Sequence, residues 1–278
     1  MINYNISITS NEKGELILNK ADGDNKSLYR CINLLKECTS AFSIGDLDIT
    51  SRVLNNWDEN NILLKQTKSK DKHYWRKFNL QEAVWLLIVK QLRDFGIPLN
   101  YIHRYKQFLL KPVYSGKSKS NSTSFLEVLV AYYLLTERVV ALKIFHDGNG
   151  AFWLQSEDNI GYYYSPNNEY NSKSAIIVHL NDIVEQLFLM PKFINRLPEL
   201  NLLNEHEKEI INIIKEGNMD ELNIMDSNAI EHPFLTTKDN FNVQDIAVAL
   251  YPTIIRKNYQ EISYKTKSGK KVVIENEH

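Results

Sequence analysis

The pattern of apolar residues predicts two consecutive helices between residues 79 and 110. Asn79 is a good N-cap with Glu82 three positions further on, and Gly96 ends the first helix. Pro98 suits the start of the second helix, because its fixed φ is already helical. The apolar positions recur three and four residues apart, at Val84, Ile88, Leu92 and Phe95 and then at Ile102, Tyr105 and Leu109. One face of each helix should therefore pack into a core.

A short helix-turn-helix is predicted just before this pair. Ser43 and Asp46 can cap a very short first helix, and a tight turn then leads to a second helix that begins near Thr50. The residues expected to face the core from this second helix are Val53, Leu54 and Trp57. The residues left on its outer side are Arg52, Asn55 and Asn56. A strand is expected at 62–64, followed by a lysine-rich hairpin.

Strand-like patterns dominate the rest of the chain. A hairpin is expected within residues 1–24, and a supporting helix at 26–36. After a polar, serine-rich stretch, Ser124 and Glu127 match a capping box before an apolar helix. Strands are then expected at 139–145, 151–155, 161–164 and 174–179, with a helix at 182–190. The final part should hold a helix from 204 to 217, a short helix at 243–250 and a hairpin that turns at Ser268 and Gly269.

Residues 147–150, Asp-Gly-Asn-Gly, lie between two of the expected strands and are predicted to form a hairpin turn. They are similar to the Gly-Asn-Gly stretch of Fic nucleotidyltransferases, but Lys143 stands where those enzymes need a catalytic histidine and Ala151 replaces their arginine. The histidines lack the spacing of metal ligands, and no Ser-His-Asp or Cys-His arrangement stands out. We therefore expect no enzymatic activity, no cofactor and no metal site.

Composition narrows the class of protein. The chain has 278 residues, 43% of them hydrophobic, so it can bury a substantial core. Its two cysteines, Cys31 and Cys38, are too few for a disulfide framework. We see no secretory signal and no apolar run of about 20 residues that could span a bilayer. These features indicate a cytoplasmic protein with no membrane partner.

The net charge of −1 gives no overall attraction to nucleic acid, so any such role must rest on a local patch. One basic cluster meets this condition: Lys65, Lys68, Lys70, Lys72, His73, Tyr74, Arg76 and Lys77. It follows the helix that carries Arg52, Asn55 and Asn56. Arginine can pair with guanine and asparagine with adenine in the major groove, while a basic hairpin can hold phosphates. We interpret all these residues as a double-stranded DNA-binding surface.

The order of these elements resembles the MerR family of bacterial transcription regulators. The matching stretches are 43–47 (Ser-Ile-Gly-Asp-Leu), 52–63 (Arg-Val-Leu-Asn-Asn-Trp-Asp-Glu-Asn-Asn-Ile-Leu), 77–78 (Lys-Phe) and 92–99 (Leu-Arg-Asp-Phe-Gly-Ile-Pro-Leu). The resemblance implies a winged helix-turn-helix that reads DNA with its second helix. Between Leu47 and Arg52 the chain is several residues shorter than the family pattern, and no sustained heptad follows residue 111. The family's coiled-coil dimer is therefore not expected here.

We predict an α+β protein with a MerR-like winged helix-turn-helix followed by a mixed α+β region. The predicted parts are a hairpin and support helix (1–41), the winged DNA-binding domain (42–111), a linker (112–124), an α+β middle domain (125–200) and a C-terminal helical region ending in a β-hairpin (201–278). The predicted function is that of a bacterial or phage transcription regulator.

Several alternatives stay open. The winged scaffold could serve a protein-interaction or mobile-element accessory factor, architectural or recombinational, instead of a regulator. A homodimer and a small-molecule effector in the middle domain are both compatible with the sequence. The aromatic residues that would line an effector pocket, or else pack as core, are Tyr132, Tyr133, Trp153, Tyr162 and Tyr163. The C-terminal lysines at 265, 267, 270 and 271 form either a second phosphate-binding hairpin or a solvated strand face.

Overall fold

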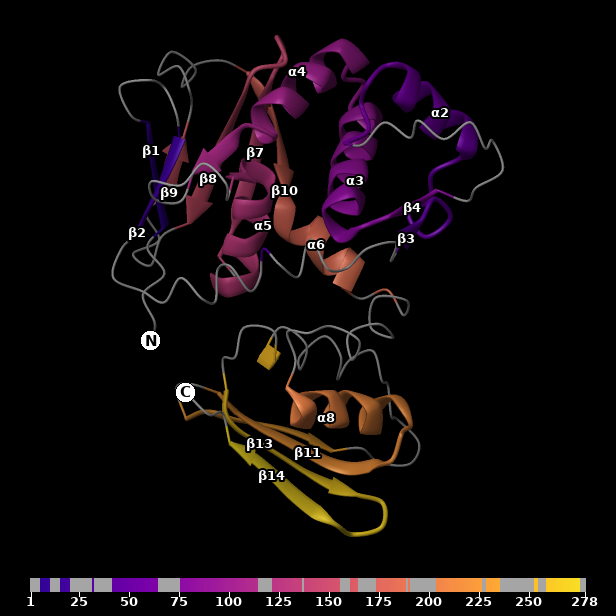
Figure 1. Ribbon diagram of the computed structural model, residues 1–278, viewed down its shortest axis with the longest axis vertical. Coiled ribbons are helices and arrows are strands. Elements are labelled where there is room, and N and C mark those ends of the chain that lie inside the picture. Colours follow the sequence, from indigo (N-terminus) through magenta and orange to yellow (C-terminus); the bar gives the residue numbers. More distant parts are fainter. Residues whose placement is uncertain are drawn as a thin grey trace. The chain divides into compact units, whose positions relative to one another are not determined.

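The structure, a computed structural model, is a mixed α+β protein with small sheets (Figure 1). It describes residues 6–10, 16–20, 32, 42–64, 76–114, 122–136, 138–155, 161–164, 174–188, 190, 204–226, 229–235, 253–254 and 259–275. The chain divides into two compact units, Asn3–Leu187 and Phe188–His278, the second together with Met1–Ile2. The predicted helix at 26–36, apart from Ile32, and the predicted helix at 243–250 lie outside the described residues.

The larger unit contains a sheet built from the N-terminal hairpin and a second, later hairpin. Its strands are β1 (Ile6–Ser10), β2 (Leu16–Lys20), β5 (Pro112–Tyr114) and β6 (Ser122–Ser124), in the order β1-β2-β5-β6. β1 and β2 are antiparallel, with Ile6 opposite Lys20, which confirms the predicted N-terminal hairpin. β2 and β5 are parallel, and β5 and β6 are antiparallel.

A second sheet of the same unit is antiparallel throughout. Its strands are β7 (Val140–Phe145), β8 (Gly150–Gln155), β9 (Gly161–Tyr164) and β10 (Ala175–His179), in the order β10-β7-β8-β9. All four match the predicted strands to within one residue. The predicted turn at 147–150 is confirmed, since the amide of Gly148 donates to the carbonyl of Phe145 at 3.0 Å and Gly148 has φ +79°.

Helices α3 (Leu80–Asp94), α4 (Leu99–Leu109), α5 (Phe125–Thr136) and α6 (Leu180–Phe188) complete this part of the unit. Both predicted capping boxes form. Asn79 and Glu82 bond each other's backbone amides at the start of α3, and Ser124 and Glu127 do the same at the start of α5. In Figure 1, α3 lies between α2 (Ser51–Glu59) and the β10-β7-β8-β9 sheet. This position agrees with the burial of α3 on nearly all its sides.

One aromatic cluster joins elements that were predicted to belong to separate domains. Phe108 of α4 lies 5.6 Å from Phe125 of α5 and 6.5 Å from Phe152 of β8, between ring centroids. Phe125 and Phe152 meet edge to face at 5.4 Å. All three rings are buried. The helices of the predicted DNA-binding region therefore share their core with the middle sheet.

The turn between β7 and β8 packs directly on α4. A Cβ atom at Gly150 would lie 2.0 Å from Cε2 of Tyr105, and one at Gly148 would lie 2.9 Å from Cα of Tyr101. Only glycine fits such close approaches. Arg104 of α4 also donates to the carbonyl of Asp147 in this turn, at 3.2 Å.

These contacts place the division of the chain elsewhere than the predicted linker at 112–124. That stretch begins and ends in strands β5 and β6, which form a hairpin, and the division falls between Leu187 and Phe188. A serine-rich composition is typical of a linker, but it equally suits the connection within a hairpin, and composition does not distinguish them.

The smaller unit contains helix α8 (Glu205–Lys215) and an antiparallel sheet. Its strands are β11 (Met219–Asp226), β12 (Glu231–Leu235), β13 (Tyr259–Thr266) and β14 (Lys271–Glu275), in the order β12-β11-β13-β14. Besides the helix and the final hairpin expected at 201–278, this region holds two strands that were not predicted, β11 and β12. In β11 the buried Leu222 and Ile224 alternate with polar residues, a pattern too short to stand out beside the helix before it.

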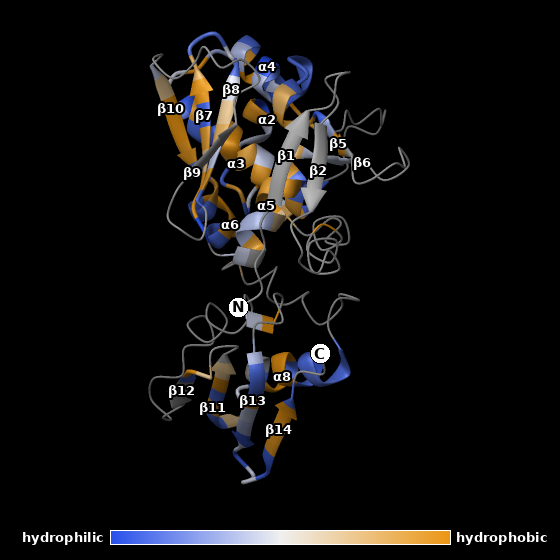
Figure 2. Cartoon of the chain, turned by 90° about the vertical axis from the view of Figure 1, so that its left-hand side faces the viewer, coloured by the Kyte–Doolittle hydropathy of each residue, from blue (hydrophilic) through white to orange (hydrophobic). Residues whose placement is uncertain are grey.

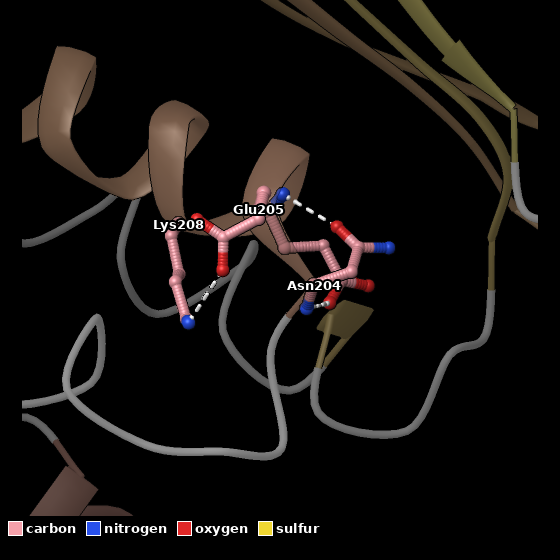
Figure 3. A network of polar contacts seen from close by, with 4 residues as sticks. Asn204, Glu205 and Lys208 are labelled. Carbon is pink, nitrogen blue, oxygen red and sulfur yellow. Dashed lines mark hydrogen bonds and ion pairs between the residues drawn. The ribbon is translucent and has the colours of Figure 1, made fainter.

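The start of α8 and the final hairpin are as predicted. Asn204 and Glu207 exchange side-chain to backbone hydrogen bonds of 2.8 Å, and Lys208 pairs with Glu205 at 2.8 Å (Figure 3). Glu207 is buried, and it also accepts a 2.6 Å hydrogen bond from the hydroxyl of Tyr259 on β13. In the hairpin, Gly269 has φ +85° and its amide donates to the carbonyl of Thr266 at 2.8 Å.

Candidate nucleic-acid interface

Helix α2 (Ser51–Glu59) is the helix predicted to read DNA. It begins where expected, with the hydroxyl of Thr50 accepting a hydrogen bond from the Val53 amide at 3.3 Å. Leu54 and Trp57 are buried, so they anchor the helix to the core of the larger unit, to which it belongs. The residues predicted for the outer side, Arg52, Asn55 and Asn56, are all exposed. The helix therefore has a narrow anchored face and a broad free one.

Two residues expected in the core lie at the surface instead. Val53 is 40% exposed and Phe95 is 60% exposed. Val53 lies beside the anchoring residues rather than between them, so it sits at the border of the buried face. Phe95 is the C-cap of α3, where the chain already turns away from the helix. Helical spacing alone does not predict that these two residues are exposed, because the width of the buried face depends on what packs against the helix.

The segment that enters α2 is a series of turns rather than the short first helix predicted from 43–46. Both the amide and the hydroxyl of Ser43 donate to the Asp46 carboxylate, at 2.7 and 2.6 Å. The amide of Ile49 donates to the carbonyl of Ile44 at 3.0 Å. Asp48 has φ +51°, which stops a helix at this point. The predicted cap residues interact as expected, but the residues after them are too few to continue a helix.

An ion pair holds this entry segment to α3. The ammonium of Lys90 lies 2.7 Å from the Asp48 carboxylate and also donates to the carbonyl of Leu47 at 3.5 Å. The hydrogen bond and the positive charge of Lys90 lower the pKa of Asp48. Leu47 and Ile49 on either side of Asp48 are buried. The backbone before α2 is thus attached both by apolar packing and by charge.

The segment that leaves α2 is held by side chains of α3 and α4. Trp85 donates its indole N–H to the carbonyl of Ile62 at 2.8 Å. Lys106 donates to the carbonyls of Asn61 and Leu63, at 2.8 and 2.6 Å, and its partial burial lowers its pKa. The predicted strand at 62–64 is therefore wrong, because these carbonyls bond to side chains of the helices rather than to a neighbouring strand.

At the base of the predicted wing, the strand that follows it pairs with a segment before α2 and not with residues 62–64 as expected. β3 (Phe42–Ser43) pairs antiparallel with β4 (Lys77–Phe78), with Phe42 opposite Phe78. Arg76, just before β4, forms a partly buried ion pair of 2.7 Å with Asp58 of α2. This pair links the segment before β4 to α2. Lys77 is exposed on β4.

The other predicted wing residues lie outside the described residues: Lys65, Lys68, Lys70, Lys72, His73 and Tyr74. Of the predicted DNA-binding residues that the structure describes, Arg52, Asn55, Asn56 and Lys77 are exposed, and Arg76 is the one engaged within the protein. Residues 76–78 and α2 lie in the same part of the unit, because the ion pair of Arg76 joins them.

Sequence reasoning did not identify the side chains that hold α2 in place. Lys90 and Lys106 contact residues more than 40 positions earlier in the chain. Trp85 looked like an ordinary apolar residue of α3. Nothing in local spacing points to such long-range contacts, although a lysine inside an otherwise apolar helix, as at Lys90, is a usable signal.

Two of the aromatic residues considered for an effector pocket are core residues. Tyr132 donates its hydroxyl to the carbonyl of Gln155 at 2.6 Å, and Tyr133 donates to the Glu185 carboxylate at 2.5 Å. Both side chains are buried, and Trp153 is half-buried. The side chains of the tyrosines at 162 and 163 are not among those described. The polar contacts of Tyr132 and Tyr133 connect α5 to β8 and to α6.

The described residues contain no group of three or more His, Cys, Asp or Glu side chains arranged to hold a metal ion. None of their helices is both long and apolar enough to cross a lipid bilayer.

Comparison with protein-family models, with curated proteins and with solved structures finds no match to this chain. The geometry of α2 and its surroundings is therefore the basis for assigning a function.

Proposed function

We propose that this protein binds double-stranded DNA in a sequence-specific manner through α2, as a bacterial or phage transcription regulator with a MerR-like winged head. One observation carries the proposal: α2 presents Arg52, Asn55 and Asn56 to solvent while Leu54 and Trp57 anchor it. A helix that offers these side chains on an exposed face suits the major groove of B-DNA.

The exposed side chains have the chemistry for base recognition. Arginine can donate two hydrogen bonds to guanine, and asparagine can pair with the N6 and N7 positions of adenine. Val53, 40% exposed beside them, can contact a thymine methyl group. The first turn of α2 contains no acidic residue. No negative side chain there would therefore oppose the attraction of phosphate to Arg52 and to the positive end of the helix dipole. The basic stretch at 65–77 would then grip the backbone.

The mounting of α2 also supports this function. Base reading requires side chains held in a defined position, which a rigid support provides. The entry to α2 is fixed by Lys90, its exit by Trp85 and Lys106, and its side by Arg76. Each of these interactions leaves the outward face free.

The test is a gel-shift series of the full chain on mixed genomic fragments at increasing salt concentration. We expect binding that weakens steeply as salt rises, because neutralised phosphates release counterions. A K68Q/K70Q variant should reduce the salt slope, by about one for each phosphate that is no longer neutralised. K267Q/K270Q removes the same charge from the exposed β13–β14 turn. We expect it to leave the slope unchanged; a reduced slope would instead identify this turn as the second phosphate-binding hairpin that the sequence left open.

The matched helix variants are N55A/N56A on α2 and N100A/N212A, which removes exposed asparagines from α4 and α8. Only the first pair should weaken binding to the retained fragments. A folded wild-type sample that binds no fragment at low salt would overturn the proposal. In that case the winged scaffold would be assigned to protein interaction, the alternative that the sequence left open.

A further inference from the structure

The outer edge of β14 lacks a neighbouring strand among those that the structure describes. β14 ends the order β12-β11-β13-β14, and its residues are Lys-Val-Val-Ile-Glu from 271 to 275. Figure 2 shows hydrophobic residues along this strand. Val273 is 47% exposed on it. An exposed apolar strand at a sheet edge is a template for pairing with another strand.

The backbone of β14 is oriented for such pairing. The amide of Thr266 donates to the carbonyl of Lys270 at 2.9 Å, so this pair faces inward across the hairpin. Inward and outward positions alternate along an antiparallel ladder, and the register from Lys265–Lys271 to Glu261–Glu275 is regular. The backbone groups of Lys271, Val273 and Glu275 therefore point away from β13.

The same three residues carry exposed side chains, while Ile274 is buried. Their charges are poorly matched within the chain. Lys271 lies directly opposite Lys265, and Glu275 lies directly opposite Glu261. Like charges in opposite positions destabilise a ladder. Lys265 has a distant acidic neighbour, Glu221, at 3.8 Å.

We propose that β14 pairs with β14 of a second copy of this chain, antiparallel and centred on Val273. This register places Val273 opposite the Val273 of the other copy and Lys271 opposite its Glu275. In each pair the outward backbone groups would exchange both N–H···O hydrogen bonds. The exposed valines would cover each other, and each unmatched charge would gain an opposite one.

The other edge of the sheet does not offer the same opportunity. β12 contains Pro233, which has no backbone N–H to donate, and proline is a common device against edge pairing. β14 contains neither proline nor glycine. β14 begins with a lysine and ends with a glutamate, so two antiparallel copies of it place each lysine opposite a glutamate. These differences select β14 as the pairing edge and a second copy as its partner.

The experiment is sedimentation velocity of the full chain over a concentration series, with charge-reversal variants. The wild type should form a concentration-dependent dimer. K271E and E275K each replace two attractive pairs of the dimer by repulsive ones, so each should weaken dimerisation at least about tenfold. K271E/E275K restores opposite charges across the axis and should recover dimerisation.

Stability of the single variants separates this proposal from misfolding. Each single variant removes a like-charge pair within the monomer, Lys265 with Lys271 or Glu261 with Glu275. The melting temperature at low concentration should therefore stay the same or rise while dimerisation falls. K267E makes the same charge change in the exposed turn and should leave the dimer intact. A wild type that stays monomeric at all concentrations, or a dimer unaffected by K271E and E275K, would overturn the proposal. The proposal does not depend on DNA binding, and DNA is absent from this experiment.

Discussion

Helices α2 and α3 are neighbours with opposite relations to solvent. α3 buries residues around most of its circumference, whereas α2 buries Leu54 and Trp57 and leaves the rest at or near the surface. Both helices start at a side chain that caps the first turn. The difference shows that α3 serves the core of the unit, while the residues of α2 can be divided into anchors and a free outer row.

This division has a practical use. A change to an anchor alters the stability of the fold, and any effect on binding is then indirect. A change to the outer row should alter binding alone, because surface substitutions usually change stability by less than about 0.5 kcal/mol. Substitutions in and around the two helices can therefore break or sharpen the comparison.

The largest effect is expected from Leu54→Ala. Leu54 lies on the buried face of α2. Removing a buried leucine side chain costs about 2–5 kcal/mol, because packing contacts are lost and a cavity is left behind. Arg52→Ala on the free side should change the free energy of unfolding by less than about 0.5 kcal/mol. Urea denaturation of both variants measures the difference. Equal decreases in stability would contradict the division into anchor and outer row.

Gly150→Ala should destabilise by about 1–3 kcal/mol, because the added methyl group would overlap the ring of Tyr105 and force α4 to shift. Gly45→Ala provides the matched control, since a Cβ there would meet only the Ser43 hydroxyl, at 3.9 Å. Melting temperatures of the two variants and the wild type measure the difference in stability. If Gly150→Ala melted like the wild type, the close packing of α4 against the β7–β8 turn would be wrong.

Removing the N-cap side chain should also cost more stability at α3 than at α2. Asn79→Ala removes one side of a reciprocal capping box at α3 and should cost about 0.5–2 kcal/mol. Thr50→Ala removes a single, exposed 3.3 Å bond at α2 and should cost less. Chemical denaturation of the two variants ranks them. A larger decrease for Thr50→Ala would mean that α2 contributes more to the fold than its burial indicates.

The smallest effect concerns pH and the pair of Asp48 with Lys90. Since the folded protein lowers the pKa of Asp48, the stabilisation is present above the unfolded pKa, about 3.9, and is lost as pH falls through the folded value. Asp48→Asn keeps a residue that tolerates positive φ. The variant should be slightly less stable than the wild type near neutral pH, and the difference should vanish in acid. A difference that persisted in acid would assign the effect to the backbone instead.

The sequence was sufficient for those local elements that strong caps, turn glycines or apolar runs mark. Strong caps such as Asn79 and Ser124 and the turn glycines 148 and 269 determine where elements begin and reverse, and these were predicted correctly. The short apolar runs of β7, β8 and β10 were also sufficient. Such features act over a few residues, so they can be found without knowledge of the tertiary structure.

Long-range packing could not be read in the same way. The cluster of Phe108, Phe125 and Phe152 joins elements across a serine-rich stretch that looked like a linker. The exposure of Val53 depends on how much of the surface of α2 the neighbouring elements cover, which the spacing of apolar residues does not indicate. Arg76 was predicted as a DNA contact, and its pairing with Asp58 arises only when the wing base meets α2. For the candidate site, the sequence therefore predicted the exposed row but not the residues that support it.

The most direct test of the central claim compares affinities for a selected DNA site and for an unrelated fragment at one salt concentration. We predict that the N55A/N56A variant keeps its weak affinity for the unrelated fragment but loses about tenfold or more of its preference for the selected site, since each good asparagine–adenine pair contributes about 1–3 kcal/mol of discrimination. A preference as large as that of the wild type would contradict sequence reading by α2.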